Sequence, residues 1–282
     1  MTRQTISPSF FIVITLLFIW LSHYLAVFPH EYAHSIMAWL VGEKENPFAL
    51  DYGGTSWRNL LLLWNIDENV DYSRMFAQGH DFQAALCAFA GPGIGTVLMF
   101  VLGGLFLKEP RIKQHPYLYY FTFWFHLMNL GNLYDYVPIR TFAHGGDIAN
   151  MVRGLHISPW WVFVLVGYPV AYLMWQFFTQ TMISLYVNLT IINLPLQAGI
   201  MVLCVLLLFG WFGGILGIIY SGNPLESGEI TYFLKIASFV SIPGVISLLW
   251  PTRKWIREKL ERSYLLRTSL SKGGQMSQVA NG

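Results

Sequence analysis

Two histidines and a glutamate near the N-terminus have the types and spacing of a metal site. Residues 30–34 read His30-Glu31-Tyr32-Ala33-His34, the pattern H-E-x-x-H, within the stretch 29–42. Residues i and i+4 project from one face of a helix, so His30 and His34 can bind one zinc ion together. Glu31 then lies beside the ion and can take a proton from a water molecule. The simpler interpretation is a pair of histidines that cap a membrane helix at the interface.

The composition predicts that a membrane positions this motif. The chain has 282 residues, of which 55% are hydrophobic and 11% charged, against about 25% charged in soluble domains. The mean hydropathy is +0.47, and the apolar runs are long enough to cross a lipid bilayer. We therefore expect an all-α polytopic membrane protein with no nucleic-acid partner. Cys87 and Cys204 lie in apolar runs and are expected to be small buried side chains rather than a disulfide.

Six transmembrane helices are predicted, with a small re-entrant or β-hairpin segment after the first. The expected spans cover residues 10–41, 81–107, 116–134, 159–178, 196–220 and 230–250. Pro29 should kink the first helix or begin a new one. Residues 1–28 lack a convincing cleavage site, so a retained anchor is favoured over a signal peptide. Residues 67–79 are interpreted as a solvated loop.

Three regions follow from this pattern. Residues 1–157 form a membrane core that carries the metal motifs, and residues 158–251 add three further helices. Residues 252–282 form a basic tail, amphipathic at first and then disordered. The basic segments predict that both termini are cytoplasmic.

A third metal ligand is expected near the third span. Polar side chains recur there every three residues along one helix face: His126, Asn129, Asn132 and Asp135. Polar groups in a membrane are costly and usually face a site or a cavity, although hydrogen bonding between helices is the alternative. Asp147 follows two glycines after this span, so both Asp135 and Asp147 qualify as the third ligand. His23 is a weaker candidate and is better explained by packing.

The order of these motifs resembles the site-2 protease family of intramembrane zinc metalloproteases. The H-E-x-x-H helix is followed by Ala-Gly-Pro-Gly-Ile-Gly-Thr at 90–96, and then by Asn132, Pro138 and a later aspartate. The resemblance covers residues 10–150. It lacks the family's L-D-G sequence, and Gly95 replaces the asparagine of the family's G-P-x-x-N pattern.

The resemblance implies peptide-bond hydrolysis with Zn²⁺ as the cofactor. The family's metal ligands fall on His30, His34 and Asp147, with Asp135 as the fallback, and its general base falls on Glu31. Asn129 or Asn132 is expected to donate a hydrogen bond to the developing oxyanion. The substrate would be a membrane protein, held by strand addition at a hairpin near residues 48–55.

Other functions fit the sequence less well. A di-iron membrane oxygenase needs more clustered histidines, and this chain has no adjacent pair. A non-catalytic transporter, or an inactive protease-like scaffold, would suit the polar stripe without needing a metal. Bound metal is the observation that separates these classes. The sequence leaves the oligomeric state open.

Overall fold

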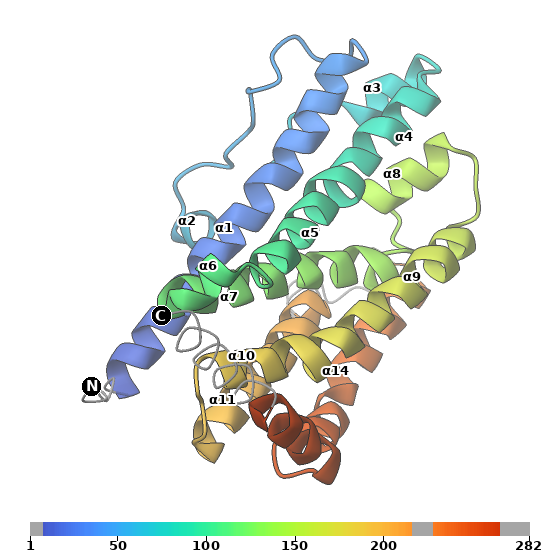
Figure 1. Ribbon diagram of the computed structural model, residues 1–282. Coiled ribbons are helices and arrows are strands. Elements are labelled where there is room, and N and C mark those ends of the chain that lie inside the picture. Colours follow the sequence, from blue (N-terminus) through green and yellow to red (C-terminus); the bar gives the residue numbers. More distant parts are fainter. Residues whose placement is uncertain (1–7, 216–227, 266–282) are drawn as a thin grey trace, which may run out of the picture.

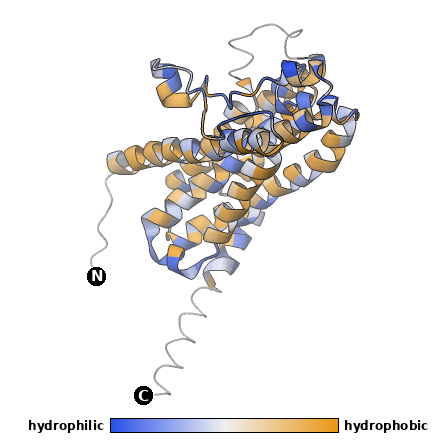
Figure 2. Cartoon of the chain, turned by 90° about the horizontal axis from the view of Figure 1, so that it is seen from above, coloured by the Kyte–Doolittle hydropathy of each residue, from blue (hydrophilic) through white to orange (hydrophobic). Residues whose placement is uncertain are grey.

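The computed structural model describes residues 8–215 and 228–265, and within these ranges the chain is built from helices. Five helical segments are long and apolar enough to cross a membrane: Ser9–Leu40, Asp81–Phe106, Pro159–Asn188, Leu194–Phe212 and Glu229–Leu249. Figure 2 shows hydrophobic colour along most of the long N-terminal helix, as expected for a surface that faces lipid. The expectation of a multi-span membrane protein is therefore supported, with five such segments in the described ranges against the six expected.

The first helix, α1 (Pro8–Leu40), has 33 residues, a length of about 50 Å at the usual helical rise. It continues through Pro29 without a break. The metal motif therefore lies within a continuous helix, on its second half. The proline removes one backbone donor directly before His30.

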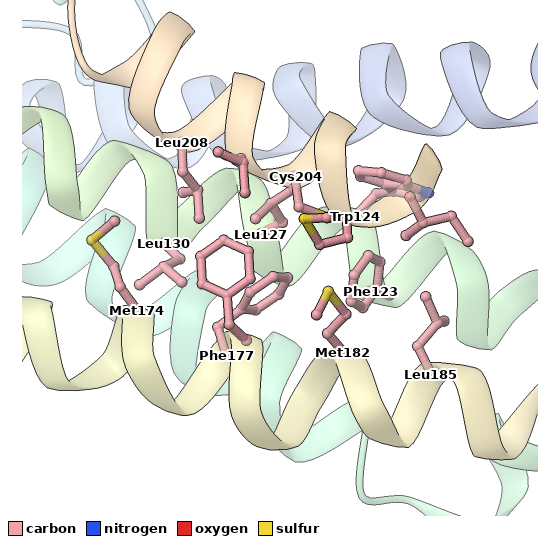
Figure 3. Close-up of a cluster of buried hydrophobic side chains, with 14 of the residues drawn as sticks. Phe123, Trp124, Leu127, Leu130, Met174, Phe177, Met182, Leu185, Cys204 and Leu208 are labelled. Atoms are coloured by element: carbon pink, nitrogen blue, oxygen red, sulfur yellow. The ribbon is translucent and has the colours of Figure 1, made fainter. Parts of the chain in front are cut away.

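The helix expected as the third span, α7 (Pro116–Tyr134), is the most enclosed. Figure 1 shows it in green at the centre, between α1 and α5 on one side and α9 and α10 on the other. Its aromatic and aliphatic side chains pack against residues of α9–α11, as Figure 3 shows for Phe123, Leu127, Phe177 and Cys204. From Tyr119 onward most of α7 is covered by protein, and its polar side chains Thr122, His126 and Asn129 are buried.

The remaining helices complete the bundle around α7. They are α2 (Trp57–Leu62), α3 (Tyr72–Ala77), α4 (Asp81–Phe89), η1 (Ala90–Thr96), α5 (Val97–Phe106), α6 (Pro110–Gln114), η2 (Asp135–Ile139), α8 (Asp147–Gly154), α9 (Pro159–Gln176), η3 (Phe177–Thr181), α10 (Met182–Asn188), α11 (Leu194–Val205), η4 (Leu206–Phe212) and α14 (Glu229–Leu249). Elements labelled η are π-helical turns, which often occur at functional sites. A further helix at 254–265 packs Ile256 and Leu260 into the core.

The segment between α1 and α4 differs from its expected form. No β-hairpin is present in this segment, which is described in full; its only pairing is an isolated bridge between Asp51 and Asp67. Residues 67–79 are not a fully solvated loop, because Met75 of α3 is buried and Glu68 is only 8% exposed. Lys44 donates hydrogen bonds to the carbonyl oxygens of Ala49 and Glu68, which ties the segment together.

Both cysteines lie where the sequence predicts. Cys87 of α4 and Cys204 of α11 are buried and free. They behave as small apolar side chains in the helix packing.

Candidate metal centre

Three side chains from two distant parts of the chain meet at one point inside the bundle. The Nε2 atoms of His30 and His34 are 3.0 Å apart, and Asp147 Oδ2 lies 3.2 Å from the first and 3.3 Å from the second. The His30 and His34 residues are 4% and 1% exposed. Ligands about 2.0–2.1 Å from a tetrahedral zinc ion lie roughly 3.3–3.4 Å apart. The triangle therefore has the size that such an ion requires.

Hydrogen bonds on the far side of each ring orient the two imidazoles. His34 Nδ1 lies 2.6 Å from the carbonyl oxygen of Cys87, and since a carbonyl only accepts, Nδ1 carries the proton. The lone pair of His34 is then on Nε2, facing the triangle. His30 Nδ1 lies 3.0 Å from Thr96 Oγ1, a hydroxyl that can donate or accept, and this contact orients the His30 ring. Such outer partners fix the tautomer and ring orientation of metal-binding histidines.

The electrostatics of the triangle favour a cation. The two Nε2 atoms and the carboxylate oxygen converge where both histidines are buried and the aspartate is partly buried. The lone pair on His34 Nε2 and the negative charge of Asp147 both attract a shared positive ion. The donor set of two histidines and one carboxylate also matches catalytic zinc sites, which keep a fourth position open. The residues present therefore fit a zinc ion.

Glycines in η1 allow this helix to approach the metal motif closely. A Cβ atom on Gly91 would lie 2.1 Å from His34 Nε2, and one on Gly95 would lie 2.7 Å from the carbonyl oxygen of Pro29. Both glycines are thus required by the contact between η1 and α1. Gly95, where the resemblance would place asparagine, has a steric role here.

Substituting Gly91 with alanine is expected to displace the His34 ring and weaken zinc binding by at least about tenfold, the lower range seen for lost outer-shell support. Competition with a chelator on the purified protein measures the affinity. Gly199→Ala in α11 is the matched control, because no atom lies within 4 Å of its added Cβ. Equal zinc affinity in both variants would contradict the role of Gly91.

Asp147 reaches the histidines because of the backbone before it. Gly146 has φ 90° and ψ −174°, a conformation open essentially only to glycine, and Asp147 follows as the first residue of α8. Asp135 instead pairs with Arg140, with Asp135 Oδ2 and Arg140 Nη1 3.4 Å apart. Of the two aspartates left open by the sequence, Asp147 is the one that joins the histidines.

Two further carboxylates surround the triangle. Glu31 follows His30 in α1 and is half-buried, within electrostatic reach of His34, Asp147 and Glu68. Glu68, from the segment between α1 and α4, is buried, and this burial raises the pKa of its carboxyl group. No sequence pattern singled out Glu68, since residues 67–79 were interpreted as a solvated loop.

A tyrosine also meets the site. Tyr136 in η2 places its hydroxyl 2.8 Å from His30 Nε2. Tyr136 lies between Asp135 and Pro138, two residues that the sequence analysis names. Phenol groups are uncommon zinc ligands, so the residue type alone did not suggest a role for Tyr136.

The other polar candidates make contacts elsewhere. Asn129 Nδ2 donates to the carbonyl oxygen of Phe125, one turn earlier in α7, at 2.8 Å. Across residues 8–215 and 228–265, no hydrogen bond joins the side chain of Asn129 or Asn132 to the triangle. His126 Nδ1 lies 3.1 Å from the carbonyl oxygen of Phe100 in α5. For His126 and Asn129, helix packing and local hydrogen bonding explain the polar stripe.

His23 packs away from the triangle. Its Nε2 lies 2.8 Å from the carbonyl oxygen of Leu62 in α2. This contact fastens the α2 segment to α1, in agreement with the packing interpretation.

Comparisons with protein-family models, with curated proteins and with solved structures found no match to this chain. The function of this protein is therefore inferred from the geometry of the site and from the order of its motifs.

Proposed function

We propose that this protein is an intramembrane zinc metalloprotease that hydrolyses peptide bonds in or near transmembrane segments of other membrane proteins. One observation carries the proposal: His30, His34 and Asp147 form a buried triangle of zinc dimensions, with Glu31 beside it on the same helix. The resemblance of the motif order to the site-2 protease family supports the same reaction.

A zinc ion held by this triangle would polarise the scissile carbonyl and acidify a water molecule. Glu31 takes one proton from the water as the water oxygen bonds to the carbonyl carbon. Glu31 then returns this proton to the amide nitrogen as the C–N bond breaks, so that a carboxylic acid and an amine leave. The two histidines stay oriented by their outer hydrogen bonds to the Cys87 carbonyl and the Thr96 hydroxyl.

The position of the site favours a substrate from the bilayer. The triangle lies inside the helix bundle, on a helix whose apolar surface is exposed along most of its length. A helical substrate hides its amide groups in its own hydrogen bonds, so the cleaved segment must first unwind locally. With α7 counted as an inner span, six spans leave both termini on one side, and the positive-inside rule favours the cytoplasm for that side.

Removing and restoring the metal tests the proposal. The purified protein in lipid vesicles, with single-span reporter proteins that carry helix-breaking residues, is expected to cleave a subset of the reporters. Cleavage should stop after treatment with a chelator and return with one equivalent of zinc per chain. Magnesium serves as the control ion, because it prefers oxygen ligands.

Two results would contradict the protease. Cleavage that survives complete removal of metal would exclude the zinc mechanism. Absence of bound zinc in the protein as isolated, together with failure to bind added zinc, would favour the transporter or scaffold.

A further inference from the structure

Tyr136 occupies a fixed position between a ligand histidine and an arginine. Its ring stacks on the His30 ring with centroids 4.9 Å apart and planes 17° from parallel. The guanidinium carbon of Arg140 lies 5.1 Å from the centroid of the Tyr136 ring, and Arg140 is itself paired with Asp135. The phenol is thus held by stacking and a cation–π contact, which leaves its hydroxyl aimed at the site.

The hydroxyl lies beside the triangle rather than over its centre. Among the described contacts, it meets His30 Nε2 at 2.8 Å but forms no hydrogen bond with His34 or Asp147. A fourth ligand of a tetrahedral ion would lie about equally far from all three ligand atoms. A neutral phenol is also a poor zinc ligand. The placement therefore suits a hydrogen-bond donor next to the metal.

We propose that Tyr136 is a catalytic residue whose hydroxyl donates a hydrogen bond to the oxygen of the scissile carbonyl as that oxygen becomes negative. The inference rests on the proposed protease function and deepens it. When His30 Nε2 binds an ion, it can no longer form a hydrogen bond with the Tyr136 hydroxyl. The hydroxyl proton is then available to a substrate oxygen at the same edge of the site.

The step balances without a further reagent. The water oxygen bonds to the carbonyl carbon, and the carbonyl π electrons move to the carbonyl oxygen. Glu31 holds the water proton, while Tyr136 keeps its own proton and only shares it in a hydrogen bond. The π bond re-forms as the C–N bond breaks and the nitrogen receives the proton from Glu31.

This donor replaces the one that the sequence suggested. Asn129 Nδ2 donates to the carbonyl oxygen of Phe125. In the described ranges, no hydrogen bond joins the Asn132 side chain to the triangle. Tyr136, by contrast, is in hydrogen-bond contact with a ligand atom. Preorganised donors of this kind act where charge develops in the transition state.

Tyr136→Phe tests the inference against Tyr134→Phe. Tyr134 lies two residues away and donates its hydroxyl to Ser238 Oγ at 2.8 Å, so its variant loses a buried hydroxyl without changing the site. Tyr136→Phe should lower kcat for a cleaved reporter about 10²–10³-fold, the usual cost of one oxyanion donor. Tyr134→Phe should cleave at close to the rate of the unmodified protein.

Two readouts do not depend on turnover. A Leu–Leu phosphinic pseudodipeptide, whose tetrahedral phosphinate mimics the hydrated peptide, should bind Tyr136→Phe roughly 100-fold more weakly. Zinc content and the visible spectrum of the cobalt-loaded protein should be unchanged, because the ligand set is intact.

Several outcomes would overturn the inference. Unchanged kcat and phosphinate affinity would show that the hydroxyl is not a donor to the substrate. Lost zinc or an altered cobalt spectrum in Tyr136→Phe would make the phenol a ligand or a structural support. An equal loss in Tyr134→Phe would indicate general packing damage.

The unmodified protein separates the two proposals. If it binds no zinc and cleaves no reporter, the protease and the role of Tyr136 fail together. If it binds zinc and cleaves a reporter, only the role of Tyr136 is in question.

Discussion

Asp147→Asn is expected to leave the purified protein without zinc, whereas Asp135→Asn should keep its zinc. Asp147 Oδ2 lies 3.2 and 3.3 Å from the two histidine Nε2 atoms, and it brings the negative charge of the donor set. An amide is neutral and a weaker donor, so the zinc affinity should fall by more than about 100-fold, the upper range for loss of an outer-shell partner. Asp135 is engaged with Arg140 and makes no contact with the triangle.

Metal analysis after dialysis, with a competing chelator of known affinity, measures the difference. The two aspartates are twelve positions apart in one connecting region, and the substitution is the same, so each variant controls for the other. Circular dichroism confirms that both variants keep their helices. Loss of zinc from Asp135→Asn, with zinc retained in Asp147→Asn, would reverse the assignment.

Glu31→Gln should abolish cleavage while the protein keeps one zinc ion per chain. Glutamine has nearly the shape of glutamate but cannot accept a proton, so the variant loses the base and preserves the packing. General-base catalysis is typically worth about 10²–10⁴-fold in rate, and kcat should fall by this factor. Binding of the phosphinic pseudodipeptide should show that the site itself is still formed.

Glu68→Gln is the matched control for Glu31. Glu68 is a second buried carboxylate near the triangle, but it comes from the segment between α1 and α4 rather than from the metal helix. We expect it to reduce cleavage much less than Glu31→Gln. A larger loss in Glu68→Gln, with activity kept in Glu31→Gln, would transfer the role of the base to Glu68.

The local parts of the site were predictable because they depend on short-range geometry. His30 and His34 share a helix face at i and i+4 whatever the rest of the chain does. Long apolar runs require helices, because a bilayer leaves backbone groups no other partners. The glycines of residues 90–96 permit a close helix crossing, which is found where Gly91 faces the His34 ring.

The parts that the sequence did not predict depend on which faces of the helices meet. Five segments satisfy length and apolarity in the described ranges, and the count of six spans stays a prediction. A hairpin was expected near residues 48–55, but the described segment has one isolated bridge, between Asp51 and Asp67. Spacing along α7 also suggested Asn129 as an oxyanion donor, but its Nδ2 donates to the carbonyl oxygen of Phe125 in its own helix.

The sequence by itself determined the membrane class of this protein and the pairing of His30 with His34, because apolar run length and helical period are local properties. Tertiary structure alone decided between Asp147 and Asp135, and it alone brought Tyr136 and Glu68 to the site. These residues come from segments far from the metal motif in the chain. Their approach depends on the close contact of η1 with α1, on the backbone at Gly146 and on the pairing of Asp135 with Arg140. Residue spacing carries no information on such contacts, because they arise only when the helices pack.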